Sequence, residues 1–288
     1  MLLCRRSSAF VINKSGLAAT TRPPQSLAPP RLRLTTDQVS QSMEIKTARP
    51  SSARSTGLAL LLDDGTRKSH SVAENTQFVT GFFKGISTPS SFGSLVSSLY
   101  FVYSAMEEEF GRCEHPAVRA LDYPELRRKD SLHRDMTFYF GGEYEDTVRP
   151  SPATRSYVSR VREVAEESPE LLVAHMYTRY LGDLFGGQMM GGMARSSLGL
   201  EGGGTDFYEF EDIQDTKKFI EGWYGTLNSL DLSDEEKGAI VDEGNRVFAL
   251  NIDVFNELEG GKRAVARSLW RLIRTGVKSR FSRKRGIA

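Results

Sequence analysis

A run of glycines inside an otherwise helical stretch is a chemically unusual feature of this 288-residue sequence. Five glycines fall between positions 182 and 192, directly after the apolar segment 171–181. Each glycine in a helix interior costs roughly 1 kcal/mol relative to alanine. Two gains commonly offset that cost: a flat ligand against bare backbone, or a kink at which the helix bends. The spacing of Gly182 and Gly186 also resembles a membrane helix-dimer motif, but Arg179, Asp183 and Gln188 argue against burial in a membrane. A ligand that lies against bare backbone is the better explanation.

A histidine and a glutamate four residues apart form a second candidate site. His70 and Glu74 share one face of a predicted helix. A carboxylate that accepts the second ring N–H orients a metal-bound imidazole and raises its basicity, although many surface helices carry such a pair. The other histidines are weaker candidates: His115 and His133 lie among charged residues and are predicted at the surface, and His175 is predicted to be a core residue.

The elements that must position these residues are predicted to be helices. No proline follows Pro169 in the remaining 119 residues, which suits long helices. Helix starts are marked by Ser168 before that proline and by a capping box that begins at Ser233. No convincing alternation predicts a strand. The sequence therefore predicts an all-α fold of seven or eight helices in one domain from about 55 to 260.

Charge is segregated along the chain, although the net charge is only +1. Residues 1–36 hold six basic residues and no acid, and residues 261–288 hold ten basic residues and no acid. The segment between them carries 37 acidic against 22 basic residues. An acidic body argues against a nucleic-acid-binding protein. No apolar stretch approaches the length of a spanning helix, and Cys4 and Cys113 form neither a disulfide framework nor a cysteine-rich metal site.

The two ends are predicted to lie outside the helical domain. Residues 1–50 are rich in serine, threonine and proline, and the first 36 of them include basic residues but no acidic ones. This composition is typical of an organelle transit peptide. An ordinary disordered N-terminus is the alternative, and cleavage is expected between positions 35 and 55. Residues 261–288 form a basic amphipathic tail, suited to peripheral contact with an anionic membrane surface or to an acidic partner. A solvated tail is the alternative reading.

The segment from Leu171 to Leu184, followed by Gly186-Gly187-Gln188, resembles the signature of heme oxygenases. The resemblance extends from about Gly65 to Leu258 and covers neither end of the chain. Further matching residues are His70-x-x-Ala73-Glu74-Asn75, Tyr103 before Glu107-Glu108-Glu109, Tyr123-Pro124-Glu125-Leu126, Asn228-Ser229-Leu230, and Phe248 with Asn251-Ile252. The resemblance implies a single multi-helix domain in which heme is sandwiched between a proximal helix and a kinked, glycine-rich distal helix.

The resemblance also implies how the ring and its iron are held. His70 would be the proximal iron ligand and the only protein ligand to the metal, with Glu74 on its free nitrogen. Gly182 and Gly186 would lie over the distal face, and Phe248 would complete the heme contacts.

Three polar residues would carry the catalytic role. Asp183, supported by Arg179 and Tyr103, would hold a distal water that hydrogen-bonds iron-bound dioxygen and delivers protons. Tyr177 would hydrogen-bond a heme propionate, and Arg67 would be its cationic anchor.

The sequence departs from the family at the propionate end. Phe185 occupies a position usually filled by serine. The positions expected to carry cations are Asp63, Ile220 and Tyr224 in an alignment without gaps, which leaves Arg67 as the sole cation. Propionate anchoring is therefore expected to be altered.

The implied activity is oxidative opening of heme to biliverdin, with release of carbon monoxide and ferrous iron. The reaction uses O2 and external electrons, since the chain shows neither a Gly-x-Gly-x-x-Gly element for a flavin nor an iron–sulfur ligand set. A plastid location, with mitochondrion as the alternative, implies reduced ferredoxin as donor and a bilin reductase downstream. The alternative function is a non-catalytic heme-binding or heme-sensing module. A helical scaffold without a cofactor would leave the glycine run unexplained.

Overall fold

The computed structural model describes residues 52–83 and 88–258, and no strand occurs among them. The predicted all-α fold is confirmed. The predicted leader (residues 1–50) and basic tail (261–288) lie outside the described residues. The expected number of helices is wrong: the described ranges hold eleven α-helices. Four of these are only four to seven residues long, too short to leave a periodic pattern in the sequence.

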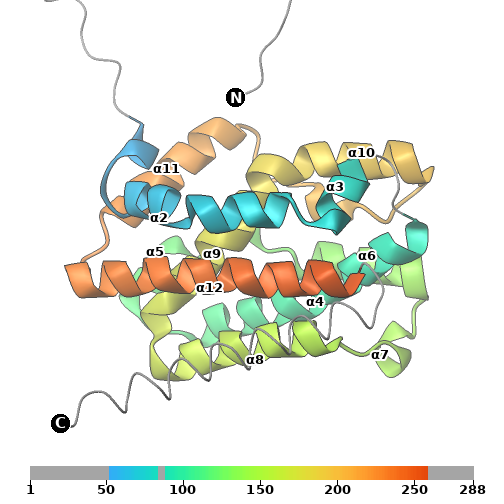
Figure 1. Ribbon diagram of the computed structural model, residues 1–288, viewed down its shortest axis with the longest axis horizontal. Coiled ribbons are helices and arrows are strands. Elements are labelled where there is room, and N and C mark those ends of the chain that lie inside the picture. Colours follow the sequence, from blue (N-terminus) through green and yellow to red (C-terminus); the bar gives the residue numbers. More distant parts are fainter. Residues whose placement is uncertain (1–51, 84–87, 259–288) are drawn as a thin grey trace, which may run out of the picture. The chain divides into compact units, whose positions relative to one another are not determined.

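Figure 1 shows the order of the helices along the chain. The α-helices outside the glycine-rich region are α2 (Gly57–Glu74), α3 (Gln77–Phe83), α4 (Pro89–Arg112), α5 (Pro116–Leu121), α6 (Lys129–Phe140), α7 (Tyr144–Thr147), α8 (Pro152–Glu167), α11 (Thr216–Asn228) and α12 (Asp234–Leu258). Short 3-10 turns are η1 (Ala53–Ser55), η2 (Pro124–Leu126), η3 (Pro169–Leu171) and η6 (Asp206–Tyr208). The predicted capping box at the start of α12 is confirmed, because Ser233 and Glu236 exchange hydrogen bonds of 2.7 and 3.2 Å. Ser168 makes no side-chain cap.

Helices α2 and α12 lie along one another, and their crossing fixes one wall of the site (Figure 1). The helices approach closely at Gly65, where a Cβ atom would lie 2.4 Å from Val241 Cγ1. Only glycine fits such a contact. Nearby, a Cβ on Gly244 would lie 3.1 Å from Thr66 Cγ2. The backbone of α2, which carries His70, is therefore held tightly against α12.

The opposite wall is an irregular helix, as the glycine run predicts. Helix α9 (Leu172–Met176) continues into two π-helical segments, η4 (Tyr177–Leu181) and η5 (Asp183–Gly187), and then into α10 (Gln188–Leu198). Hydrogen bonds to the fifth residue widen a helix locally and are frequent at functional sites. The disturbance in the sequence thus corresponds to altered helical winding.

The glycines of this segment face in two directions. A Cβ on Gly187 would lie 2.8 Å from Tyr208 Cδ1, and one on Gly191 would lie 2.8 Å from Tyr208 Cβ. Close packing against Tyr208 therefore requires these two glycines. A Cβ on Gly182 or Gly186 would meet no atom within 4 Å. Contact with a ligand is consequently needed to explain only part of the glycine run.

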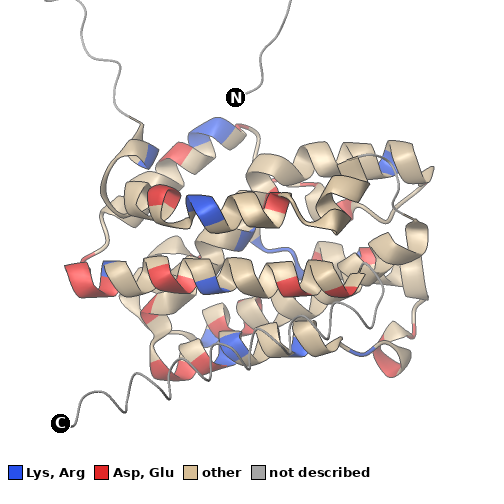
Figure 2. Cartoon of the chain, viewed as in Figure 1, with Lys and Arg blue, Asp and Glu red and all other residues tan. Residues whose placement is uncertain are grey.

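Charged residues are spread over the helices that form the face in Figure 2. Both acidic and basic residues occur along α2, α8 and α12 on this face, without a continuous basic band. Within residues 52–83 and 88–258, no helix combines the length and the apolar character needed to cross a bilayer.

Candidate functional site

A cleft of about 430 Å³ lies between α2 and the π-helical segments, a volume within the usual range of small-molecule sites. All seven residues predicted to bind the cofactor line it: Arg67, His70, Glu74, Tyr177, Gly182, Gly186 and Phe248. The remaining lining residues are Arg54, Asp63, Thr66, Thr178, Leu181, Phe185 and Tyr224. The structure thus brings together residues that lie as far apart in the chain as η1 and α12.

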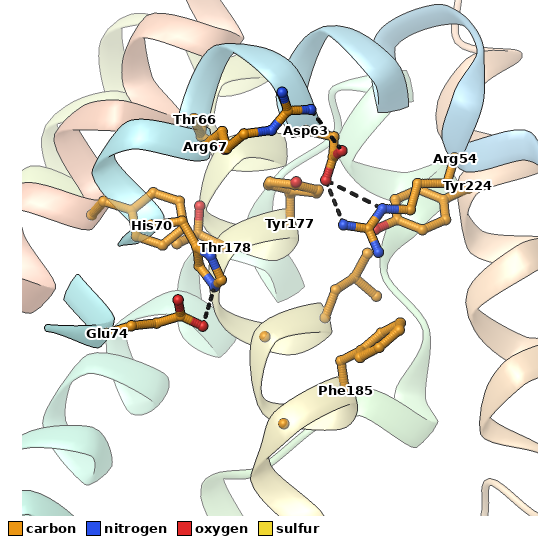
Figure 3. A pocket seen from close by; sticks show the side chains of 14 residues that line it. Arg54, Asp63, Thr66, Arg67, His70, Glu74, Tyr177, Thr178, Phe185 and Tyr224 are labelled. Carbon is orange, nitrogen blue, oxygen red and sulfur yellow. Dashed lines mark hydrogen bonds and ion pairs between the residues drawn. The ribbon is translucent and has the colours of Figure 1, made fainter. Parts of the chain in front are cut away.

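His70 and Glu74 stand at one side of the cleft (Figure 3). The His70 side chain is 55% exposed, and its ring meets Phe248 edge-on, with centroids 5.4 Å apart. Glu74 Oε1 lies 3.7 Å from His70 Nε2, which is longer than a hydrogen bond. In this orientation Nδ1 is the nitrogen left free for a metal, and a half-turn of the ring exchanges the two nitrogens. The predicted pair therefore exists as neighbours, without the predicted hydrogen bond.

Bare backbone and apolar side chains form the facing wall. Gly182 and Gly186 present open space where side chains would stand. Leu181 and Phe185 flank them, and the Phe185 side chain is exposed. A planar apolar ligand fits this wall, because it can approach the backbone without meeting a Cβ atom.

The three predicted catalytic residues lie together behind this wall and do not line the cleft itself. Asp183 Oδ2 accepts hydrogen bonds from the Tyr103 hydroxyl and from Arg179 Nη2, the latter at 2.8 Å. Sequence reasoning did not assign a role to Asn251, whose Oδ1 accepts from Arg179 Nη1 at 2.8 Å. Asn251 is in turn held by Val247 O at 2.9 Å. The only sequence feature that could have pointed to Asn251 was its place among the residues that resemble the heme oxygenase family.

Burial shapes the proton affinities of this network. Burial raises the pKa of Asp183, and the neighbouring Arg179 and Tyr103 oppose that rise. Burial and the Asp183 charge raise the pKa of Tyr103 well above its ordinary value. Burial lowers the pKa of Arg179, but Asp183 and nearby tyrosines outweigh it, so the net shift is upward. Arg179 stays charged and Tyr103 stays protonated, which leaves Asp183 as the member suited to accept and return a proton.

Arg54 is a cation of the cleft that the sequence analysis missed. Its guanidinium binds Asp63 through Nη2 at 2.5 Å and Nε at 3.2 Å, and lies 5.8 Å from the Phe185 ring centroid. Arg67 Nη2 lies 3.7 Å from the other Asp63 oxygen. The expectation that Arg67 is the sole cation is therefore wrong. An alignment without gaps could not assign Arg54, because it stands in the segment expected to precede the domain.

Of the other two positions expected to carry cations, one lines the cleft and one does not. Tyr224 lines the cleft beside Arg54, whereas Ile220 is buried and does not line it. Burial raises the pKa of both Tyr177 and Tyr224, so both phenols remain hydrogen-bond donors at neutral pH.

The remaining histidines lie away from the cleft. His175 is fully buried, as predicted, and its Nε2 lies 3.2 Å from Glu243 Oε1. Arg160 Nη2 binds the same carboxylate at 2.6 Å. His133 is exposed, as predicted, whereas His115 is half-buried and caps α5.

Comparison with known proteins agrees with this architecture. The heme oxygenase family model matches residues 56–257. Heme oxygenase 1 of Synechocystis is 50% identical over 207 residues, which cover 72% of this chain and 86% of that protein. Heme oxygenase of Rhodella violacea is 47% identical over 205 residues, which cover 70% of this chain and 87% of that protein.

Solved structures agree as well. The crystal structure of heme oxygenase-1 from Synechocystis in complex with heme has a TM-score of 0.69 and 46% identity, and covers 77% of this chain and 100% of that chain. The structure of heme oxygenase from Leptospira interrogans has a TM-score of 0.67 and 41% identity, and covers 70% of this chain and 100% of that chain. With the sequence signature, the helical cleft and these matches in agreement, the chain belongs to the heme oxygenase family.

Proposed function

We propose that this protein opens heme to biliverdin and releases carbon monoxide and ferrous iron, with O2 and external electrons as co-reactants. One observation carries the proposal. His70 and the bare backbone of Gly182 and Gly186 line facing walls of one cleft, and the hydrogen-bonded Asp183 lies directly behind the glycine wall.

The residues of the cleft fit heme as a substrate. The missing Cβ atoms leave room for a flat ring, and Leu181 and Phe248 supply apolar contact. Thr178 Oγ1 is buried and has no hydrogen-bond partner among the described residues, so a polar ligand atom or water has a place there. Bound heme supplies both the iron at which O2 reacts and the ring that is opened.

The chain's own residues then divide the work. His70 holds the iron, and Glu74 orients the imidazole once the two close to hydrogen-bond distance. The glycine wall keeps side chains away from the ring. Asp183 moves protons through a water molecule, while Arg179 and Tyr103 fix its carboxylate.

Electrons come from a separate protein, for which reduced ferredoxin is the proposed donor. Similarity to the heme oxygenases of Synechocystis and Rhodella violacea is the support for this proposal. The serine- and proline-rich residues 1–50 suit a plastid leader, with a mitochondrial leader as the alternative. In a plastid, a bilin reductase is the class of enzyme that would consume the biliverdin.

The alternative function is a non-catalytic heme-binding module. The argument for it was the absence of cations at the positions expected to hold the propionates. Arg54 supplies a cation at that end of the cleft. Both His70 and Asp183 are also in place, so no observation now favours the alternative.

The full chain tests the proposal when it is mixed with hemin, ferredoxin, ferredoxin reductase, NADPH and ascorbate under air. We expect the Soret band to decay while a biliverdin band grows and carbon monoxide is released. Omission of ferredoxin, with hemin and the other components kept, is the matched control for the donor. A Soret band that persists with the complete mixture would identify a binding module instead.

A further inference from the structure

The turn that carries Arg54 precedes the family-matched segment, yet it is bonded firmly to the domain. Ser52 Oγ donates to Glu221 Oε2 at 2.8 Å, and Ala53 N donates to the other oxygen of Glu221. Asn228 Nδ2 donates to Ala53 O at 2.7 Å. These bonds attach η1 to α11 and direct Arg54 into the cleft (Figure 3).

The two cations at this end of the cleft, Arg54 and Arg67, pair with the same carboxylate. Asp63 stands between Arg54 and Arg67 and contacts both guanidinium groups (Figure 3). Arg54 holds the shorter contact, at 2.5 Å against 3.7 Å for Arg67. The Arg67 side chain is 70% exposed and also pairs with Asp64, whereas the Arg54 side chain is 45% exposed.

Arg54 also has neighbours suited to a bound ring. Its guanidinium lies against the Phe185 ring, and the Tyr224 phenol stands beside it. A cation next to an aromatic face and a phenol donor offers one carboxylate a charge-assisted hydrogen bond and the adjoining ring edge an apolar contact.

On the basis of the proposed function, we infer that Arg54 is the main anchor for a carboxylate of the tetrapyrrole substrate, and that Asp63 competes with that carboxylate for Arg54. The anchor lies at the side of the cleft opposite His70 and Glu74. It would therefore set how the ring is turned between the two walls, and so which edge of the ring lies at that side of the cleft. Arg54 stands just before the residues that the family model matches, 56–257.

The test measures the affinity of the full chain for two metal-free porphyrins by fluorescence titration. Protoporphyrin IX carries two free carboxylates, and its dimethyl ester carries none. Arg54→Gln should weaken protoporphyrin IX binding about tenfold, the loss expected for one charge-assisted hydrogen bond, and change ester binding less than twofold. Arg54→Lys should recover part of the affinity. Arg119→Gln, at an exposed position on α5 outside the cleft, is the matched control and should change neither probe.

Asp63→Asn tests the competition, and should tighten protoporphyrin IX binding several-fold while ester binding stays constant. Equal losses for acid and ester in Arg54→Gln would show a structural role and overturn the anchor. Weaker acid binding in Asp63→Asn would overturn the competition. Failure of the proposed function has a different signature: the wild-type chain would bind both probes and distinguish them through Arg54, yet form no biliverdin from heme.

Discussion

Asp183 Oδ2 lies 2.8 Å from Arg179 Nη2, four residues earlier on the same irregular helix. The Tyr103 hydroxyl, from α4, donates to the same oxygen. One carboxylate oxygen is thus held from two elements, and Asp183 itself does not line the cleft. This arrangement fixes the proton-accepting group without exposing its charge directly to the ring.

Asp183→Asn should slow biliverdin formation about a hundredfold, in the range attributed to general acid–base catalysis. The amide keeps the size of the side chain but cannot carry a proton between water molecules. Protoporphyrin IX affinity should stay within twofold of wild type, because Asp183 does not line the cleft. Initial rates of biliverdin formation and fluorescence titration measure the two effects. Asp242→Asn, at an exposed position on α12 outside the cleft, is the control. Wild-type rates in Asp183→Asn would refute the assigned role.

His70→Ala should leave heme bound by the apolar walls but remove the iron ligand from the protein. The Soret maximum should shift, turnover should stop, and added imidazole should restore part of both. His133→Ala is a suitable control, since that histidine is exposed and lies outside the cleft. A histidine-ligated spectrum that survives in His70→Ala would show that another residue binds the iron.

Gly191→Ala and Gly192→Ala should change stability in opposite directions. A Cβ on Gly191 would lie 2.8 Å from Tyr208 Cβ, whereas one on Gly192 would meet nothing within 4 Å. Overpacking should lower the free energy of unfolding of Gly191→Ala by about 1–3 kcal/mol. Alanine loses less backbone entropy than glycine on folding, so the free energy of unfolding of Gly192→Ala should rise by up to about 1 kcal/mol. Urea unfolding of both variants measures the difference, and equal effects would show that Tyr208 does not require the glycine.

The buried cluster of Arg160, His175 and Glu243 should make the protein sensitive to acid. Burial raises the pKa of the Glu243 carboxyl, but His175 and Arg160 outweigh it and hold that pKa at about 2. Burial lowers the pKa of His175. Both groups therefore bind protons more readily in the unfolded chain, so stability falls as pH falls: below about 6.5 through His175 and between about 4.5 and 2 through Glu243.

Glu243→Gln isolates the carboxylate part of this dependence. At pH 7 the variant should lose about 1–3 kcal/mol, because Arg160 exchanges its buried carboxylate partner for a neutral amide and keeps only the more exposed Glu163, at 2.9 Å. Its stability should also fall less steeply than that of wild type between pH 5 and pH 3. Chemical unfolding at several pH values measures both, and parallel curves for the two proteins would contradict the pKa assignment.

Local spacing in the sequence was sufficient to predict the parts of the site that lie within one helix. His70 with Glu74, and Arg179 with Asp183, are each four residues apart, so any helix places them together. Residues joined only by the tertiary fold left no such signal. Arg54 meets Phe185 across the cleft, Gly191 is required by Tyr208 on a later turn, and Glu243 pairs with His175 from another helix. The pattern of glycines was visible, but its two separate causes were not.

The contact between Gly65 and Val241 leaves no space for a methyl group, so the backbone of α2 packs closely against α12 at that point. His70 and Phe248, one on each helix, therefore keep their mutual spacing. On the opposite side of the cleft, Gly182 and Gly186 meet nothing and belong to widened helical turns. We therefore expect a change in the width of the cleft to come from the glycine side. A rigid planar substrate and a flexible open-chain product differ in thickness, so we expect product release to be governed by motion of residues 177–187, while the iron-binding side stays fixed between turnovers.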